Sequence, residues 1–329
     1  MKYAIFSLLL VIFLGCRDSV FTDRKNDQQY VFDSYWKEID RNYSFFSYTH
    51  VNWDSVYATV RPLVGPDISN DSLFNLLVKT TNILHDAHTN VYAPQGIGGN
   101  IDYFDTYREN QITLNNDVYF EYYVTDRIFE YGKLKNVNTG YIKIKTFEGT
   151  PEDFEKIDSI FLILDKTEKL ILDVRSNFGG EISNSKIVAS RLADSTHYVG
   201  QYRVRNGPSH DNFSDWINIF ISPVNNGIHI NKPVTILTNR RSYSATEWFV
   251  LFTAVLPQVK TVGDTTGGGS AMPLFRELPN GWLLRISNTQ IKTPAGRDFQ
   301  NTGLFPDVPI WISLDDEEKG IDTILEKAK

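Results

Sequence analysis

The stretch PVTILTNRRSYSATEWFVLFTAVL, residues 233–256, indicates the fold class most directly. It opens with an apolar run over residues 233–239 and continues as a helical pattern over residues 244–256. A strand that is apolar along its whole length is buried on both faces of its sheet, which requires helices to cover it. The stretch therefore predicts an α/β domain in which one strand ends just before a helix begins.

The neighbouring sequence repeats this alternation of strands and helices. Apolar runs at 140–147, 169–175 and 259–264 predict further strands, and helical patterns at 153–165 and 181–194 lie between them. From residue 139 onward, the sequence therefore predicts a parallel or mixed sheet that is covered on both faces by helices.

Two other patterns precede this core. Residues 28–84 repeat apolar side chains at spacings of three and four, as in YVFDSYWKEIDRNY at 30–43, which predicts helices. Residues 90–138 are rich in aromatic and β-branched side chains, which favours strands. The chain accordingly divides into a signal peptide (1–15), a tether (16–27), an N-terminal helical subdomain (28–92), a β-rich connecting segment (93–138), a core (139–312) and a C-terminal helix (313–329).

The N-terminus, MKYAIFSLLLVIFLGC, predicts export. Its apolar core runs from Ala4 to Leu14, which is too short for a comfortable membrane span and suits a signal peptide. Cys16, the single cysteine of the chain, stands where cleavage is expected, and the segment resembles a bacterial lipoprotein signal. We therefore expect lipidation of Cys16 and a lipid-anchored protein of the bacterial cell envelope. A plain secretory signal with a chance cysteine is the alternative.

The composition sets limits on the class of protein. A net charge of −7 and a pI near 5.4 argue against nucleic-acid binding, which usually requires a basic face. His85, Asp86 and His88 lie close together in sequence, but no third histidine or cysteine cluster accompanies them, so we expect no metal site.

Two segments that follow predicted strands contain candidate catalytic groups. Ligands of open α/β sheets bind at such strand ends. In LDVRSNFGGEIS, residues 172–183, Gly179 and Gly180 could expose backbone N–H groups to a developing oxyanion. Ser244 stands at the first turn of the next predicted helix and could act as a nucleophile if a base reached it. Taken alone, the first junction is better explained as a simple glycine-rich loop, and the second as helix capping by Ser242 or Ser244.

Six motifs in order resemble those of the C-terminal-processing (tail-specific) proteases, in the branch of the tricorn core and the retinoid-binding-protein-like repeats. The resemblance runs from about residue 30 to residue 312, and its motifs are LHDAHT (84–89), GYIKIKTF (140–147), LILDVRSNFGG (170–180), VTILTNRRSYSATEWF (234–249), VGDTTGGG (262–269) and NTGLFPDVPI (301–310). The resemblance implies a crotonase/ClpP-like core of ββα units, serine peptidase activity on peptide or protein substrates, and no cofactor.

The resemblance also implies roles for individual residues. It makes Ser244 the nucleophile and His88 the general base, while Ser242 and His85 have no catalytic role. It assigns the oxyanion hole to the backbone N–H groups of Ala245 and of Gly179 or Gly180. Asp86 is then expected to hold its loop.

The sequence departs from the family pattern at three places. Gly269 stands where the lysine-dependent branch has its catalytic lysine, so a serine–lysine dyad is absent. Gln300 stands where the tricorn-like branch has a glutamate; its amide could orient the His88 ring but could not stabilise an imidazolium by charge. We therefore expect either reduced activity or a replacement carboxylate, with Asp298 and Asp307 as the nearest candidates.

The third departure concerns substrate recognition. Only about fifty residues separate LHDAHT from GYIKIKTF, which is too few for the peptide-binding PDZ domain of many relatives. Two alternatives to a peptidase remain open on the sequence: a catalytically weak or inactive relative that binds peptides or apolar ligands, and an anchored scaffold protein whose serines only cap helices. The sequence does not indicate the oligomeric state.

Overall fold

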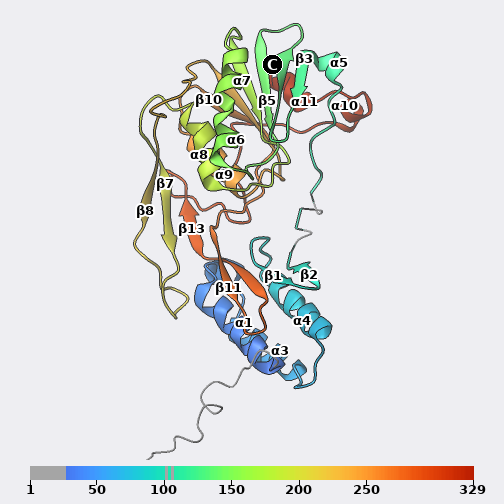
Figure 1. Ribbon diagram of the computed structural model, residues 1–329, viewed down its shortest axis with the longest axis vertical. Coiled ribbons are helices and arrows are strands. Elements are labelled where there is room, and N and C mark those ends of the chain that lie inside the picture. Colours follow the sequence, from blue (N-terminus) through green and yellow to red (C-terminus); the bar gives the residue numbers. More distant parts are fainter. Residues whose placement is uncertain (1–26, 101–102, 105–106) are drawn as a thin grey trace, which may run out of the picture.

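The computed structural model describes residues 27–100, 103–104 and 107–329. The predicted signal peptide and the lipidation site at Cys16 lie outside these residues. The molecule has an upper α/β part and a lower part in which N-terminal helices pack against strands from the C-terminal half of the chain (Figure 1).

A seven-stranded mixed sheet forms the centre of the upper part. Its order is β14-β10-β9-β6-β5-β4-β3, with parallel pairing from β14 to β5 and antiparallel pairing from β5 to β3. The four strands predicted at 140–147, 169–175, 233–239 and 259–264 are confirmed as β5, β6, β9 and β10. The strand bounds are β3 Phe120–Thr125, β4 Phe129–Leu134, β5 Thr139–Ile144, β6 Lys169–Asp173, β9 Val234–Thr238, β10 Val259–Gly263 and β14 Val308–Pro309.

Helices cover both faces of this sheet, as the apolar strands require. One face packs against α6 (Pro151–Glu155), α7 (Ile157–Ile163), α8 (Ile182–Ser190) and α9 (Ala245–Thr253), which together enclose the largest apolar core. The other face packs against α5 (Asn116–Tyr119) and α11 (Thr323–Ala328), and α10 (Leu314–Glu318) lies beside them (Figure 1). The region predicted as one helix at 153–165 forms two, and the C-terminal region also forms two short helices instead of one.

The lower part combines distant segments of the chain. Its helices are α1 (Gln28–Asn42), α2 (Phe46–Thr49), α3 (Trp53–Val60), η2 (Arg61–Leu63) and α4 (Asn70–Asn82). They pack against a sheet of order β11-β12-β1-β2, made of β11 (Pro273–Glu277), β12 (Leu283–Ser287), β1 (Asn90–Ala93) and β2 (Gly96–Gly98). The core predicted at 139–312 includes β11 and β12. In the structure, however, Trp282, Leu284 and Ile286 bury their side chains among the N-terminal helices.

A third sheet runs along one side of the molecule. It consists of β7 (His197–Val204), β8 (Ile217–Ile221) and β13 (Thr289–Lys292) in the order β13-β7-β8. In Figure 1 the β7–β8 hairpin extends from the upper part toward the helices of the lower part, and the guanidinium of Arg205 donates hydrogen bonds to the backbone carbonyls of Asp40 and Tyr43 at the end of α1.

The connecting segment predicted at 93–138 is divided in the structure: β2 belongs to the sheet of the lower part, whereas β3 and β4 join the central sheet and α5 precedes β3. Among the residues that the structure describes, no helix combines the length and the apolar character needed to cross a membrane.

Candidate active site

Ser244 is the residue immediately before α9, and its backbone is strained. Its φ of 58° and ψ of −122° lie in a region that residues with a Cβ atom rarely adopt, and such geometry costs on the order of 1–3 kcal/mol. Strain of this kind persists only where the surroundings enforce it, and it recurs at functional sites. The Ser244 side chain lies on the wall of a cleft of about 870 Å³.

Glu247, one turn into α9, fixes this turn to the loop at 266–269. One carboxylate oxygen accepts hydrogen bonds from Thr266 Oγ1 at 2.6 Å and from the N–H of Gly268 at 2.8 Å. The other accepts from the N–H of Gly269 at 2.6 Å and from the N–H of Ser244 at 3.3 Å. Burial raises the pKa of Glu247 to about 7, against the opposing effect of these four donors. Glu247 lies within the motif VTILTNRRSYSATEWF, and the sequence alone does not indicate this role.

The glycine loop after β6 lies against the same turn. A Cβ atom added to Gly179 would lie 2.8 Å from both the Ser244 Cβ and the Ala245 backbone nitrogen. The Gly179 N–H donates to Asn177 Oδ1 at 2.9 Å, so it is already used. The N–H groups of Gly180 and Ala245 make no hydrogen bond within the described residues, and Gly180 lines the Ser244 cleft. Of the two predicted glycines, the geometry therefore favours Gly180 as the oxyanion donor beside Ala245.

His88 lies close to this turn but is not hydrogen bonded to it. Its ring is almost fully buried, and neither ring nitrogen has a hydrogen-bond partner among the described residues. The ring contacts that of Tyr243, with 4.7 Å between centroids. Burial lowers the pKa of His88 well below its ordinary value, and the positive charge of Arg285 lowers it further. The imidazole is thus neutral at neutral pH, which is the form that a general base requires.

Gln300 lies in the same buried region, but its amide has other partners. Its Oε1 accepts hydrogen bonds from the Ser270 N–H at 3.0 Å and from Ser270 Oγ at 2.8 Å. Its Nε2 donates to Asp86 Oδ1 at 3.4 Å. The hydrogen bond from His88 to Gln300 that the resemblance implies is therefore not formed in this arrangement.

The candidate replacement carboxylates are also engaged elsewhere. Asp298 accepts from the Gln300 N–H at 2.7 Å and from the Tyr48 hydroxyl at 3.0 Å. Asp307 accepts from the N–H and the hydroxyl of Thr261, at 2.8 and 2.9 Å. Both carboxylates thus hold loops together, and among the described residues neither is hydrogen bonded to the His88 ring.

Two further residues of the predicted motifs have structural contacts. Asp86 accepts from the His88 N–H at 3.0 Å and from the Thr89 hydroxyl at 2.7 Å, so it holds the loop that carries His88. Ser242 is buried, and its hydroxyl donates to the Val174 carbonyl at 2.9 Å. Its hydroxyl therefore links two strand ends instead of facing the cleft.

Two residues of the site could not be found by sequence reasoning. Arg285 on β12 reaches the same cleft as Ser244, although it comes from the sheet of the lower part. The Tyr243 ring contacts that of His88, and it lies where a side chain at position 269 would start. In the described part of the chain, no group of three or more His, Cys, Asp or Glu side chains is arranged to hold a metal ion.

Comparison with known proteins identifies the family. The family model "Peptidase family S41" matches residues 138–310, which is more than half of the chain. The chain belongs to peptidase family S41. A second model, the tricorn protease C1 domain, matches residues 24–81 of this S41 protein, a range that includes α1, α2, α3, η2 and most of α4.

Curated relatives match the core of this S41 protein. The carboxy-terminal processing protease CtpB of Bacillus subtilis is 27% identical over 181 residues, which are 54% of this chain and 35% of CtpB. CtpA of the same organism is 24% identical over 179 residues, 54% of this chain and 36% of CtpA. The aligned region thus spans about a third of the length of these relatives.

Solved structures extend the likeness over nearly the whole chain. A protein from Parabacteroides merdae, described as a candidate peptidase, is 32% identical with a TM-score of 0.82, covering 92% of this chain and 95% of that one. The photosystem II D1 C-terminal processing protease has the same fold with a TM-score of 0.56 at 17% identity, covering 91% of this chain and 97% of that one.

Proposed function

We propose that this S41 protein is a serine endopeptidase in which Ser244 forms an acyl-enzyme. The observation that carries the proposal is the strained Ser244 turn, which lines an open cleft beside the N–H groups of Gly180 and Ala245, neither of which has a hydrogen-bond partner in the described part of the chain. Ordinary helix capping does not require strained geometry, and a capping serine has no need of a neighbouring oxyanion site.

The proposed reaction proceeds in two acyl-transfer steps. The Ser244 oxygen attacks the peptide carbonyl carbon, and its proton passes to the neutral His88 ring. The carbonyl oxygen gains the negative charge and accepts hydrogen bonds from Gly180 and Ala245. The carbon–nitrogen bond then breaks and the leaving amine takes the proton from His88. Water repeats the sequence on the acyl-enzyme and restores Ser244.

This mechanism requires His88 and Ser244 to come into hydrogen-bond contact when substrate binds. Catalytic hydrogen bonds of free enzymes are often long and tighten only in the substrate complex. The two unpartnered nitrogens of the His88 ring support this step, because no existing hydrogen bond has to be broken for either nitrogen to reach the serine. Gln300 then has only an indirect role, through Asp86 and the His88 loop.

The proposal extends to the place where the enzyme acts. The signal-like N-terminus and Cys16 support a lipid-anchored protein of the bacterial cell envelope that acts on peptides or proteins there. The alternation of paired strands and helices, with Gly179 and Gly180 after β6 and Ser244 at the start of α9, supports the crotonase/ClpP-like description of the core.

A second candidate function is that of a weak or inactive relative that binds peptides or apolar ligands. It is favoured by one observation, that the Gln300 oxygen is fully used by Ser270 and leaves the His88 ring without an orienting acceptor.

Cleavage of unfolded protein substrates by the purified chain tests the proposal. We expect wild type to release fragments, Ser244→Ala to release none, and Ser242→Thr to keep activity if it folds. Binding of the same substrates by wild type and Ser244→Ala without any cleavage would instead support the second candidate. Loss of the lipid label in Cys16→Ser, measured by mass spectrometry, tests the anchor separately.

A further inference from the structure

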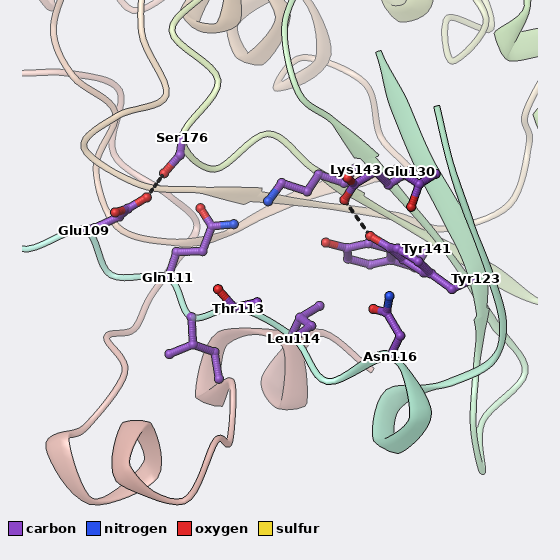
Figure 2. Close-up of a pocket in the computed structure, with 12 residues that line it drawn as sticks. Glu109, Gln111, Thr113, Leu114, Asn116, Tyr123, Glu130, Tyr141, Lys143 and Ser176 are labelled. Carbon is purple, nitrogen blue, oxygen red and sulfur yellow. Dashed lines mark hydrogen bonds between the residues drawn. The ribbon is translucent and has the colours of Figure 1, made fainter. Parts of the chain in front are cut away.

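A second cavity, distinct from the Ser244 cleft, lies between strands β3–β5 and the segment 109–116. Its volume is about 480 Å³, and neither Ser244 nor His88 lines it. Figure 2 shows Lys143 reaching across this cavity toward Gln111, with Glu109 and Ser176 beyond. Cavities of this size accommodate small molecules.

The two acidic groups of the cavity already have partners. Glu109 accepts a hydrogen bond from the Ser176 hydroxyl at 2.8 Å and pairs with Arg241 at 3.5 Å. Glu130 accepts from the Tyr123 hydroxyl at 2.7 Å and pairs with Lys145 at 3.4 Å. Their negative charges are therefore balanced within the protein.

Lys143 differs from these two glutamates in its contacts. Its ammonium group has no carboxylate at ion-pair distance and no hydrogen bond within the described residues, although it lines a partly enclosed cavity. Beside it, the Gln111 Oε1 atom is buried and also has no partner in this part of the chain. One cation is thus available to a negatively charged group of a ligand, and the Gln111 oxygen is available to a ligand N–H group, whereas the glutamates on either side disfavour a ligand with several negative charges.

We propose that this cavity binds the carboxylate of a small ligand, with Lys143 as its cationic partner and the Gln111 oxygen as an acceptor for an N–H group of the same ligand. A lysine ammonium and a carboxylate form a charge-assisted hydrogen bond, which is about twice as strong as a neutral one. The carboxylate can belong to a small free acid or to the C-terminus of a short peptide, since both present the same group.

The cavity is connected to the candidate active site by a short chain of hydrogen bonds. The Ser176 N–H donates to Asn239 Oδ1 at 2.9 Å, and Asn239 Nδ2 donates to Ser176 Oγ at 3.1 Å. The Asn239 N–H in turn donates to Ser242 Oγ at 3.1 Å. Ser176 precedes the Gly179–Gly180 loop, and Ser242 precedes Ser244. A bound carboxylate that moves Ser176 therefore alters the oxyanion loop and the nucleophile turn together; this effect on catalysis rests on the proposed function.

Isothermal titration of the full Ser244→Ala chain tests the binding site independently of catalysis. The probes are N-acetylglycine as the small acid, N-acetylglycylglycine as the peptide acid, and the C-terminal amides of both. We expect one or both acids to bind, and each bound acid to bind about tenfold or more tightly than its amide, because the amide lacks the charge. Which acid binds more tightly identifies the source of the carboxylate.

Variants then locate the carboxylate. Lys143→Gln should weaken acid binding about tenfold or more, whereas the control Lys133→Gln should not, because Lys133 on β4 pairs with Glu121 and neither residue lines the cavity. Equal binding of acids and amides, or no binding of either, would overturn the proposal. So would loss of binding in Arg285→Gln with normal binding in Lys143→Gln, because the carboxylate would then lie in the Ser244 cleft. If the site binds acids but wild type shows no peptidase activity, the proposed function fails and the binding site stands.

Discussion

The ring of Tyr243 occupies the space in which a side chain at position 269 would begin. A Cβ atom added to Gly269 would lie 2.1 Å from Tyr243 Cζ, far inside van der Waals contact. The same ring contacts His88. The Tyr243 ring therefore fills the space that the lysine of the lysine-dependent branch would need at position 269.

This arrangement predicts that a side chain at position 269 is not tolerated. We expect Gly269→Ala to lower the free energy of unfolding by about 1–3 kcal/mol, because it overpacks a buried site, and Gly269→Lys to lower it further. Urea unfolding followed by circular dichroism measures the change. Gly65→Ala is the matched control, since a Cβ atom there meets nothing within 4 Å. Equal stability of Gly269→Ala and wild type would show that the Tyr243 ring moves aside freely.

Glu247 should be needed as a carboxylate, even though it does not take part in the proposed chemistry. All four of its hydrogen-bond partners donate to it, so in Glu247→Gln the amide N–H₂ would face two N–H or O–H donors. Leaving buried donors unsatisfied costs about 1–3 kcal/mol for each group. We expect a marked loss of stability and of activity, measured by thermal unfolding and peptide cleavage, whereas the exposed Glu155→Gln should change neither.

Gln300→Glu should not improve the enzyme, contrary to what the family pattern alone suggests. The Gln300 Nε2 faces Asp86 Oδ1 at 3.4 Å, so a glutamate would bring two buried carboxylates together. We expect lower stability at neutral pH and partial recovery at acidic pH, where one of the two carboxyls takes up a proton. Unfolding at pH 5 and pH 8 measures this difference. A variant that is as stable as wild type at both pH values and cleaves faster would show that the glutamate turns toward His88 instead.

The stability of the protein should depend on pH through His88. Burial lowers the folded-state pKa of His88 below the unfolded value of 6.5, so the unfolded chain binds the proton more readily. The stability from neutral His88 is therefore present above the unfolded pKa and is lost as pH falls through 6.5 toward the folded pKa, at about 1.4 kcal/mol per pH unit.

The measurement compares the free energy of unfolding of wild type and His88→Leu between pH 8 and pH 5. Glu247, whose pKa is raised to about 7, acts in the opposite direction, because its contribution is lost as pH rises through that value. Since Glu247 is present in both proteins, the difference between them isolates His88. A difference that does not change with pH would mean that His88 becomes protonated as easily in the folded chain as in the unfolded one.

Much of the fold follows from local sequence patterns. The apolar runs at 169–175 and 233–239 predict buried strands, because no other environment suits them, and the structure confirms β6 and β9. The return of β11 and β12 to the N-terminal helices could not be predicted. It depends on contacts of Trp282, Leu284 and Ile286 with residues far away in sequence, which leave no local signal.

Some residues of the candidate site could likewise be predicted from local sequence, and others could not. Ser244, Gly180 and Ala245 lie at junctions of strand, loop and helix, where sequence pattern indicates exposed backbone N–H groups. The positions of Tyr243 and Arg285 depend on how the two parts of the molecule meet. The partners of the Gln300 amide were equally inaccessible, because Ser270 and Asp86 reach it only in the folded chain.

The most direct test of the account is covalent labelling of the purified soluble chain with a fluorophosphonate probe, which reacts with activated serines. Wild type should be labelled, Ser244→Ala and His88→Ala should not, and circular dichroism should show all three folded. Labelling of Ser244→Ala, or none of folded wild type, would contradict the claim that Ser244 is a nucleophile activated by His88.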